Sequence, residues 1–301
     1  YNVGIGDNAL TANTTGINNV AVGTFALDAN TTASHSIAIG HEALSAVTTT
    51  GENIAIGRQA LLVNTSGSEN TSIGFQNLAA NTTGGSNTGV GYRALQANTT
   101  GSANTAVGKE ALVTNTTASY NTGIGNSALR VNTTGADNVA IGKDALKANT
   151  TAAGNTAVGR DALLANTTGP HNVAFGMGAL QANTTAEYNV AVGRNALAVN
   201  TTGIRNIGIG YQALTNNTTA NYNVSMGFQS MYLSTTGANN VAVGSFTLDA
   251  NTTGELNTAV GDSALSANTT AARNTAMGDR TLGGNTTASD NTAMGSYALA
   301  G

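Results

Sequence analysis

The chain of 301 residues carries few charges: 9% of its residues are charged, and the formal net charge is −4. This balance excludes the basic stripe with which nucleic-acid-binding proteins neutralise phosphates. The absence of cysteine excludes disulfides, thiolate metal sites and cysteine nucleophiles. No apolar stretch approaches the roughly 18 residues of a transmembrane helix, so we expect no membrane span.

A repeat of 17 residues runs through the whole chain. The triplet Asn-Thr-Thr returns at intervals of 17 residues or multiples of 17, without insertion or deletion. Such a repeat fixes the architecture before any motif is considered, so we expect residues 1–301 to form a single uninterrupted array. The array begins and ends within a repeat and shows no atypical capping repeat, which indicates a segment of a longer chain.

Each repeat, or coil, begins with an apolar alternation, counting positions from Tyr1. Position 3 is Val, Ile or Thr, position 5 is always apolar, and position 4 between them is Gly, Ala or Ser. This period of two predicts a strand whose positions 3 and 5 face the core. Position 4 would then lie on the opposite face, where a neighbouring chain could pack. Position 6 is Gly in all 18 copies, which indicates a positive φ or a close approach of another backbone.

A second apolar stretch follows at positions 10 and 12. Position 10 is Leu in 17 copies and Met231 in the other. These positions fit either a second short strand or one helical turn. We favour the strand, because the glycine at position 6 and the turn at positions 13–16 leave little room for a helix. Positions 1, 7, 8, 11 and 17 vary freely and carry nearly all the charged and aromatic residues.

The Asn-Thr-Thr triplet occupies positions 13–15 and has three interpretations. It forms a turn whose stacked Asn amides bond from coil to coil, or it is a row of Asn-x-Ser/Thr sequons carrying glycans on Asn or sugars on Thr, or its threonines bind ice. We favour the turn, because Val47 and Ser234 replace Asn without changing the repeat length. The candidate glycosylation sites are Asn13, Asn30, Asn64, Asn81, Asn98, Asn115, Asn132, Asn149, Asn166, Asn183, Asn200, Asn217, Asn251, Asn268 and Asn285.

A 17-residue unit with one or two short strands and two turns is typical of a β-solenoid. We therefore predict an all-β fold, a parallel β-solenoid or β-roll of about 18 coils with 17 residues in each. At a strand spacing of about 4.8 Å the array would extend for about 85 Å. Each coil has few aliphatic side chains with which to offset its ordering entropy, so lateral association is expected.

The pentapeptides Asn19–Gly23, Asn138–Gly142 and Asn189–Gly193 read Asn-Val-Ala-(Val/Ile)-Gly and are followed by x-x-Ala-Leu in most coils. This core resembles the YadA-like head repeats of trimeric autotransporter adhesins, and similar repeats occur in phage tail-fibre-like proteins. The resemblance covers the five-residue core of every repeat. It implies a left-handed parallel β-roll that assembles as a homotrimer on a cell or virion surface. The family's repeat is shorter than 17 residues, so the added Asn-Thr-Thr turn leaves coil shape and oligomeric state open.

No residue pattern predicts catalysis or a cofactor. His35, His41 and His171 stand at variable positions, and His35 lies eight coils from His171, too far to share a metal. Asp144 and Asp161 lie beside Lys143 and Arg160, an arrangement typical of a solvated surface network. The neighbouring-coil aromatics Phe75/Tyr92 and Tyr211/Phe228 either stack as ordinary surface packing or form a sugar-binding strip.

These observations favour a non-enzymatic, extracellular structural or adhesive fibre, a self-associating shaft or head in which homotrimers, other homo-oligomers or filaments are the expected assemblies. The alternatives are a scaffold coated with sugars on the Asn-Thr-Thr turns, or a repeat module that binds host or environmental glycans or ice. No nucleic acid partner is expected.

Overall fold

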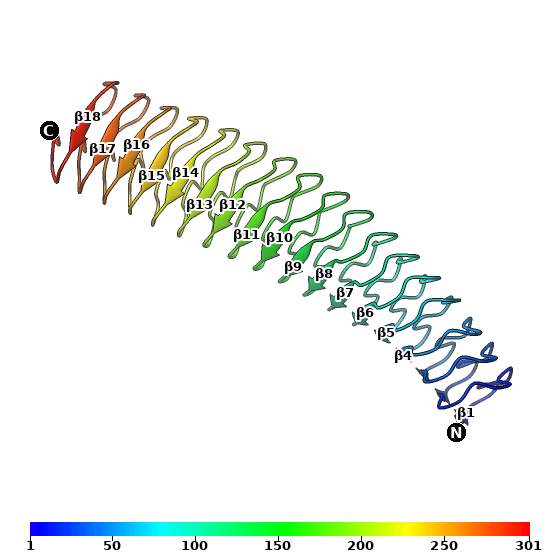
Figure 1. Cartoon of the computed structure of the whole chain (residues 1–301). Helices are drawn as coiled ribbons and strands as arrows, with labels where there is room; N and C mark the ends of the chain where they lie inside the picture. The colour runs from blue at the N-terminus through cyan, green and yellow to red at the C-terminus, as the bar shows by residue number, and fades with distance from the viewer. The chain divides into compact units, whose positions relative to one another are not determined.

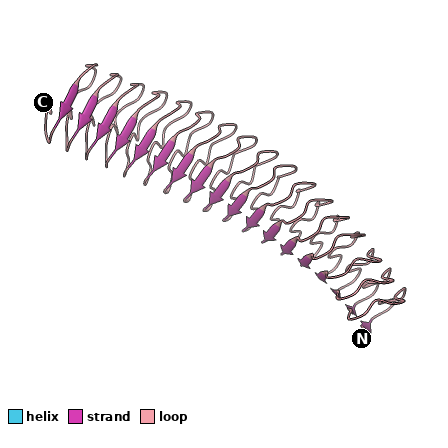
Figure 2. Ribbon diagram, in the orientation of Figure 1, coloured by secondary structure: helices cyan, strands magenta, loops and turns pink.

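The computed structural model describes all residues, 1–301, as an all-β chain without helix, in which each coil contributes one three-residue strand (Figures 1 and 2). The chain divides into two units, Tyr1–Ala153 and Gly154–Gly301. Within each unit the strands are parallel, and each is offset from its neighbour by one repeat. The predicted parallel β-solenoid with 17-residue coils is thereby confirmed.

The first unit contains nine strands that pair in chain order, each residue opposite its equivalent in the next coil. They are β1 (Val3–Ile5), β2 (Val20–Val22), β3 (Ile37–Ile39), β4 (Ile54–Ile56), β5 (Thr71–Ile73), β6 (Thr88–Val90), β7 (Thr105–Val107), β8 (Thr122–Ile124) and β9 (Val139–Ile141).

The second unit repeats this arrangement with nine further strands. They are β10 (Thr156–Val158), β11 (Val173–Phe175), β12 (Val190–Val192), β13 (Ile207–Ile209), β14 (Val224–Met226), β15 (Val241–Val243), β16 (Thr258–Val260), β17 (Thr275–Met277) and β18 (Thr292–Met294).

The glycine at position 6 ends each strand, for both of the reasons that the sequence suggested. Gly108 has a φ of 133°, in the region that favours glycine. A Cβ there would also lie 2.5 Å from the carbonyl oxygen of Gly125, the equivalent glycine of the next coil. The close backbone is therefore the chain's own next coil.

The prediction of a second strand at positions 10–12 is wrong. Those positions lie in turns, and the buried Leu at position 10 takes a positive φ, 52° at Leu112. A non-glycine residue in this region costs about 1 kcal/mol or more. The N–H of Leu112 donates to the carbonyl of Ala128 at 3.0 Å, and the fully buried side chain stacks in the core, so bonding and burial hold the unfavourable conformation.

The predicted orientation of the strand is also wrong. From the second coil onward the small residue at position 4 is buried, whereas positions 3 and 5 are half-buried or exposed. In β7, Ala106 is fully buried between the half-buried Thr105 and Val107. The coil is too thin to hold two branched side chains per strand. Its interior accepts Ala at positions 4 and 9, Leu at position 10, and Asn at positions 2 and 13.

Candidate functional surfaces

The outward side chains of positions 3 and 5, here called the strand face, form the most regular surface of each unit. In-register pairing places Val, Ile or Thr along the row of position 3 and Ile, Val, Met or Phe along the row of position 5. No charged residue occurs at either position in any coil. Phe175, the last residue of β11, is 56% exposed.

The asparagines of position 13 form an internal ladder, which is interrupted at Val47 and Ser234. The Asn98 Nδ2 group donates to Oδ1 of Asn81 in the preceding coil at 2.9 Å and to the carbonyl of Gly101 in its own turn, also at 2.9 Å. Asn115 in turn donates to Oδ1 of Asn98 at 2.9 Å. Both amide hydrogens and the amide oxygen are thus engaged, which satisfies a buried polar group.

All fifteen candidate glycosylation sites lie at this ladder position. Asn13 and Asn285 are half-buried, and the other thirteen are fully buried. A sugar on any of the buried Nδ2 atoms would have to replace an internal hydrogen bond and open the corner of the coil. The arrangement supports the turn-and-ladder interpretation of the triplet, and glycosylation of these residues stays a prediction.

Position 2 supplies a second asparagine ladder that converges on the first. Asn70 Nδ2 donates to the carbonyl of Gly84 at 2.9 Å, and Asn81 Nδ2 donates to the same oxygen at 2.9 Å. The residue at position 16 therefore has its carbonyl held by two amides, an arrangement we call the carbonyl clamp. Position 2 is Asn in every coil except that of Ser36, and the sequence alone assigns this Asn no role beyond opening the pentapeptide core.

The two threonines of the triplet have different surroundings. The Thr99 hydroxyl at position 14 donates to the carbonyl of Thr116 in the next coil at 3.0 Å, and this bond recurs along both units. The position-15 side chain, such as Thr100, is exposed in every coil and makes no hydrogen bond within the chain. The coils with Val47 and Ser234 retain Thr49 and Thr236 at position 15, so the hydroxyl is kept even where no sequon exists.

The neighbouring-coil aromatics stack as predicted. The ring centroids of Phe75 and Tyr92 lie 5.5 Å apart at 8°, and those of Tyr211 and Phe228 lie 5.2 Å apart at 12°. The Arg58 guanidinium lies 5.9 Å from the Phe75 ring, and the Lys109 ammonium lies 6.0 Å from that of Tyr92. Stacking and cations therefore occupy the ring faces that a sugar would need, and mainly ring edges remain open.

The charged residues form local surface pairs. Asp144 lies 3.1 Å from Lys147 and 3.8 Å from Lys143, and Asp161 lies 3.2 Å from Arg160. No group of three or more His, Asp or Glu side chains could hold a metal ion. Surface pairs of this kind contribute little to stability.

Two aspartates at position 11 depart from this pattern. Asp28 and Asp249 occur in nearly identical sequences, Phe-Ala-Leu-Asp-Ala-Asn and Phe-Thr-Leu-Asp-Ala-Asn, and each has one carboxylate oxygen buried without a hydrogen-bond partner. Burial raises the pKa of both carboxyl groups above the ordinary value, and Glu42 raises that of Asp28 further.

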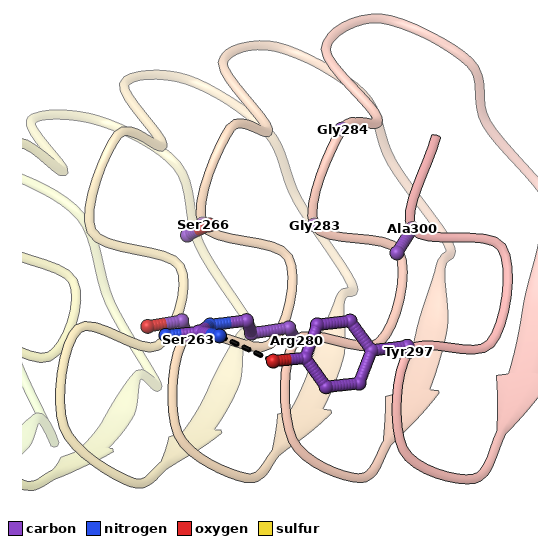
Figure 3. Close-up of a pocket in the computed structure, with 7 residues that line it drawn as sticks. All are labelled: Ser263, Ser266, Arg280, Gly283, Gly284, Tyr297 and Ala300. Carbon is purple, nitrogen blue, oxygen red and sulfur yellow. Dashed lines mark hydrogen bonds between the residues drawn. The ribbon is translucent and has the colours of Figure 1, made fainter.

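A cavity of about 440 Å³ opens beside Gly283 and Gly284, the glycines at positions 11 and 12 of their coil (Figure 3). Arg280 reaches across it and donates to the hydroxyl of Tyr297. Ser263 and Ser266 complete its wall. The Ser263 hydroxyl already donates to Asp262 at 3.1 Å, so the polar groups of this cavity largely satisfy one another.

No family model matches the chain, and no curated protein matches it either. The chain forms no helix that is long and apolar enough to cross a membrane.

Proposed function

We propose that this chain is a non-enzymatic structural segment of an extracellular fibre or adhesin, and that copies associate laterally through the strand face. The observation that carries the proposal is the orientation of the strand, which turns two uncharged rows of Val, Ile, Thr, Met and Phe toward solvent. A homotrimer on a cell or virion surface is the assembly that the resemblance to adhesin head repeats favours.

The size of the strand face supports association. If each outward side chain leaves on the order of 50 Å² of apolar surface uncovered, the nine coils of one unit present about 900 Å². A standard protein interface buries about 800 Å² on each partner. One unit is therefore large enough to contribute a full share of a stable interface, and a second copy supplies the matching uncharged, regularly spaced partner.

Crosslinking tests this proposal, because the natural chain contains no cysteine. A Thr156→Cys variant places one thiol on the strand face near the middle of the chain, and Thr151→Cys places one at the exposed position-15 corner as a matched control. With a short bis-maleimide we expect efficient covalent multimers from Thr156→Cys and few from Thr151→Cys. Equal crosslinking of the two variants, or none from Thr156→Cys, would contradict the proposal.

A further inference from the structure

The third coil, residues 35–51, is the one coil that departs from the repeat at positions 2, 13 and 16 together. Position 2 is Ser36 rather than Asn, position 13 is Val47 rather than Asn, and position 16 is Thr50, where every other coil has Gly or Ala. Four departures occur at these three positions in the entire chain, and three of them fall in this coil.

These three positions together make up the carbonyl clamp, in which the amides of positions 2 and 13 hold the carbonyl of position 16. In the preceding coil the carbonyl of Ala33 accepts hydrogen bonds from Asn19 at 2.8 Å and Asn30 at 3.2 Å. In the following coil the carbonyl of Gly67 accepts from Asn53 at 3.0 Å and Asn64 at 2.8 Å. The third coil has lost both amide donors and has changed the residue whose carbonyl they would hold.

The corner of the coil is released as a result. The backbone N–H groups of Thr31 and Thr32 donate to the carbonyl of Thr48, and that of Thr65 donates to Thr82, but none joins Thr48 or Thr49 to Thr65. The strand side stays in register, since β3 pairs with both β2 and β4. The coil is therefore opened only at its hydroxyl-bearing corner.

The coil of Ser234 shows that a single loss does not produce this opening. There Asn223 still donates to the carbonyl of Gly237 at 2.8 Å, and the N–H of Thr235 still bonds the carbonyl of Thr252 at 2.9 Å. Loss of the position-13 Asn alone is therefore not enough to open the corner.

A cavity of about 340 Å³ occupies the released corner. Its wall includes the hydroxyl side chains of Thr32, Ser34, Thr49 and Thr50, with His35 and Glu52. The Thr50 hydroxyl oxygen is inaccessible and has no partner in the chain. His35 contacts Asn18 at 3.2 Å, and the Ser34 hydroxyl accepts from the N–H of Ile17 at 3.0 Å. The side chains of Thr32, Thr49 and Glu52 keep their donors and acceptors for a ligand.

We propose that this cavity is a binding site for a single uncharged sugar residue. Its volume lies in the small-ligand range, which begins at about 300 Å³. Hydroxyl groups both donate and accept, and the Glu52 carboxylate can accept from two neighbouring sugar hydroxyls. The lone carboxylate opposes anions, and a single acidic side chain is too few to hold a cation. The site lies at the corner of the coil, away from the strand face, so it does not depend on association of copies.

The test restores the consensus of the repeat. Wild-type protein is titrated with D-glucose, D-galactose, D-mannose and N-acetyl-D-glucosamine, and binding is followed by saturation-transfer NMR and calorimetry. The variant S36N/V47N/T50G rebuilds the clamp, and we expect it to bind at least about tenfold more weakly while melting at a higher temperature. Glu52→Gln, which leaves the corner open, should weaken binding about fivefold.

Ser234→Asn repairs the ladder in a distant coil and is the matched control, for which binding should not change. Saturable binding that is lost only in the variants of the third coil would support the site. The site would be overturned if none of the four sugars bound, or if S36N/V47N/T50G bound sugar as tightly as the natural chain. Binding of Ca²⁺ alone to this corner would also overturn the assignment to a sugar.

Discussion

The Asn-Thr-Thr triplet places two chemically identical residues in opposite roles. The hydroxyl of the first threonine donates a hydrogen bond to the next coil, whereas that of the second faces solvent. The sequence motif alone does not separate them, because each residue of the triplet occurs in nearly every coil.

Valine substitutions at Thr99 and Thr100 test this division. Thr99→Val removes the 3.0 Å bond to the Thr116 carbonyl and should cost about 1 kcal/mol, seen as roughly fivefold faster hydrogen exchange of the surrounding amides. Thr100→Val should change stability by less than about 0.5 kcal/mol. Equal effects at the two positions would contradict the assignment.

The raised pKa values of Asp28 and Asp249 predict a pH dependence. A carboxyl group whose pKa is raised on folding binds its proton more tightly in the folded chain, so its stabilising contribution is present at low pH and is lost as pH rises through the folded pKa. Above that pKa the ionised carboxylates, each with one buried oxygen, oppose folding.

Asp249→Asn should therefore raise the urea midpoint at pH 7, and the gain should shrink as the pH falls through the raised pKa of the folded chain toward the ordinary value of about 4. Asp290 is the control, because its bond to Arg273 holds its pKa below the ordinary value. The contribution of Asp290 to stability should therefore depend on pH in the opposite direction. A gain for Asp249→Asn that grows toward acid pH would contradict the account.

At the scale of the coil, the two asparagine ladders replace much of the apolar core. Burial of two amides per coil is tolerated because each finds donors and acceptors in its neighbours. The break at Ser234 shows the cost, since the Oδ1 atom of Asn217 and the hydroxyl of Ser234 are both buried without partners.

Ser234→Asn should restore the ladder and stabilise the chain by about 1 to 3 kcal/mol, because it supplies the donor that Asn217 lacks. The measurement is the urea midpoint together with amide exchange at Asn217 and Thr235. Ser225→Asn, at a buried position outside the ladder, is a control expected to destabilise. An unchanged or lowered midpoint for Ser234→Asn would show that the ladder contributes nothing there.

The repeat length, the strand at positions 3–5, the glycine turn and the aromatic stacks were all predictable from the sequence. Those features depend on local pattern and on equivalence between coils. The inward side of the strand was not predictable from alternation alone, because either face of Val20-Ala21-Val22 is compatible with a period of two. The restriction of position 4 to Gly, Ala and Ser was the available signal, since only small residues fit inside so thin a coil.

The cavity of the third coil was also beyond sequence reasoning. Val47 was recognised as a departure from the triplet, but the link among Ser36, Val47 and Thr50 appears only when three positions meet at one carbonyl. A role for the asparagine of position 2 is visible only in three dimensions.

At the scale of the whole molecule, charge is confined to particular rows. Every charged side chain lies at positions 1, 7, 8, 11 or 17, so the strand face and the residues of the Asn-Thr-Thr triplet carry no charge in any coil. A repeated surface without charge is suited to lateral contact, because no coil introduces repulsion that its neighbours would have to offset.

Sedimentation of a charged variant tests this central claim most directly. The variant replaces Val90, Val107, Ile124 and Ile141, all on the strand face, with Lys, and a control places Lys at the exposed corner residues Thr83, Thr100, Thr117 and Thr134. We expect the natural chain and the control to sediment as multiples of 29.8 kDa, and the strand-face variant to shift toward the monomer. Sedimentation of the natural chain as a 29.8 kDa monomer at micromolar concentration would contradict association through the strand face.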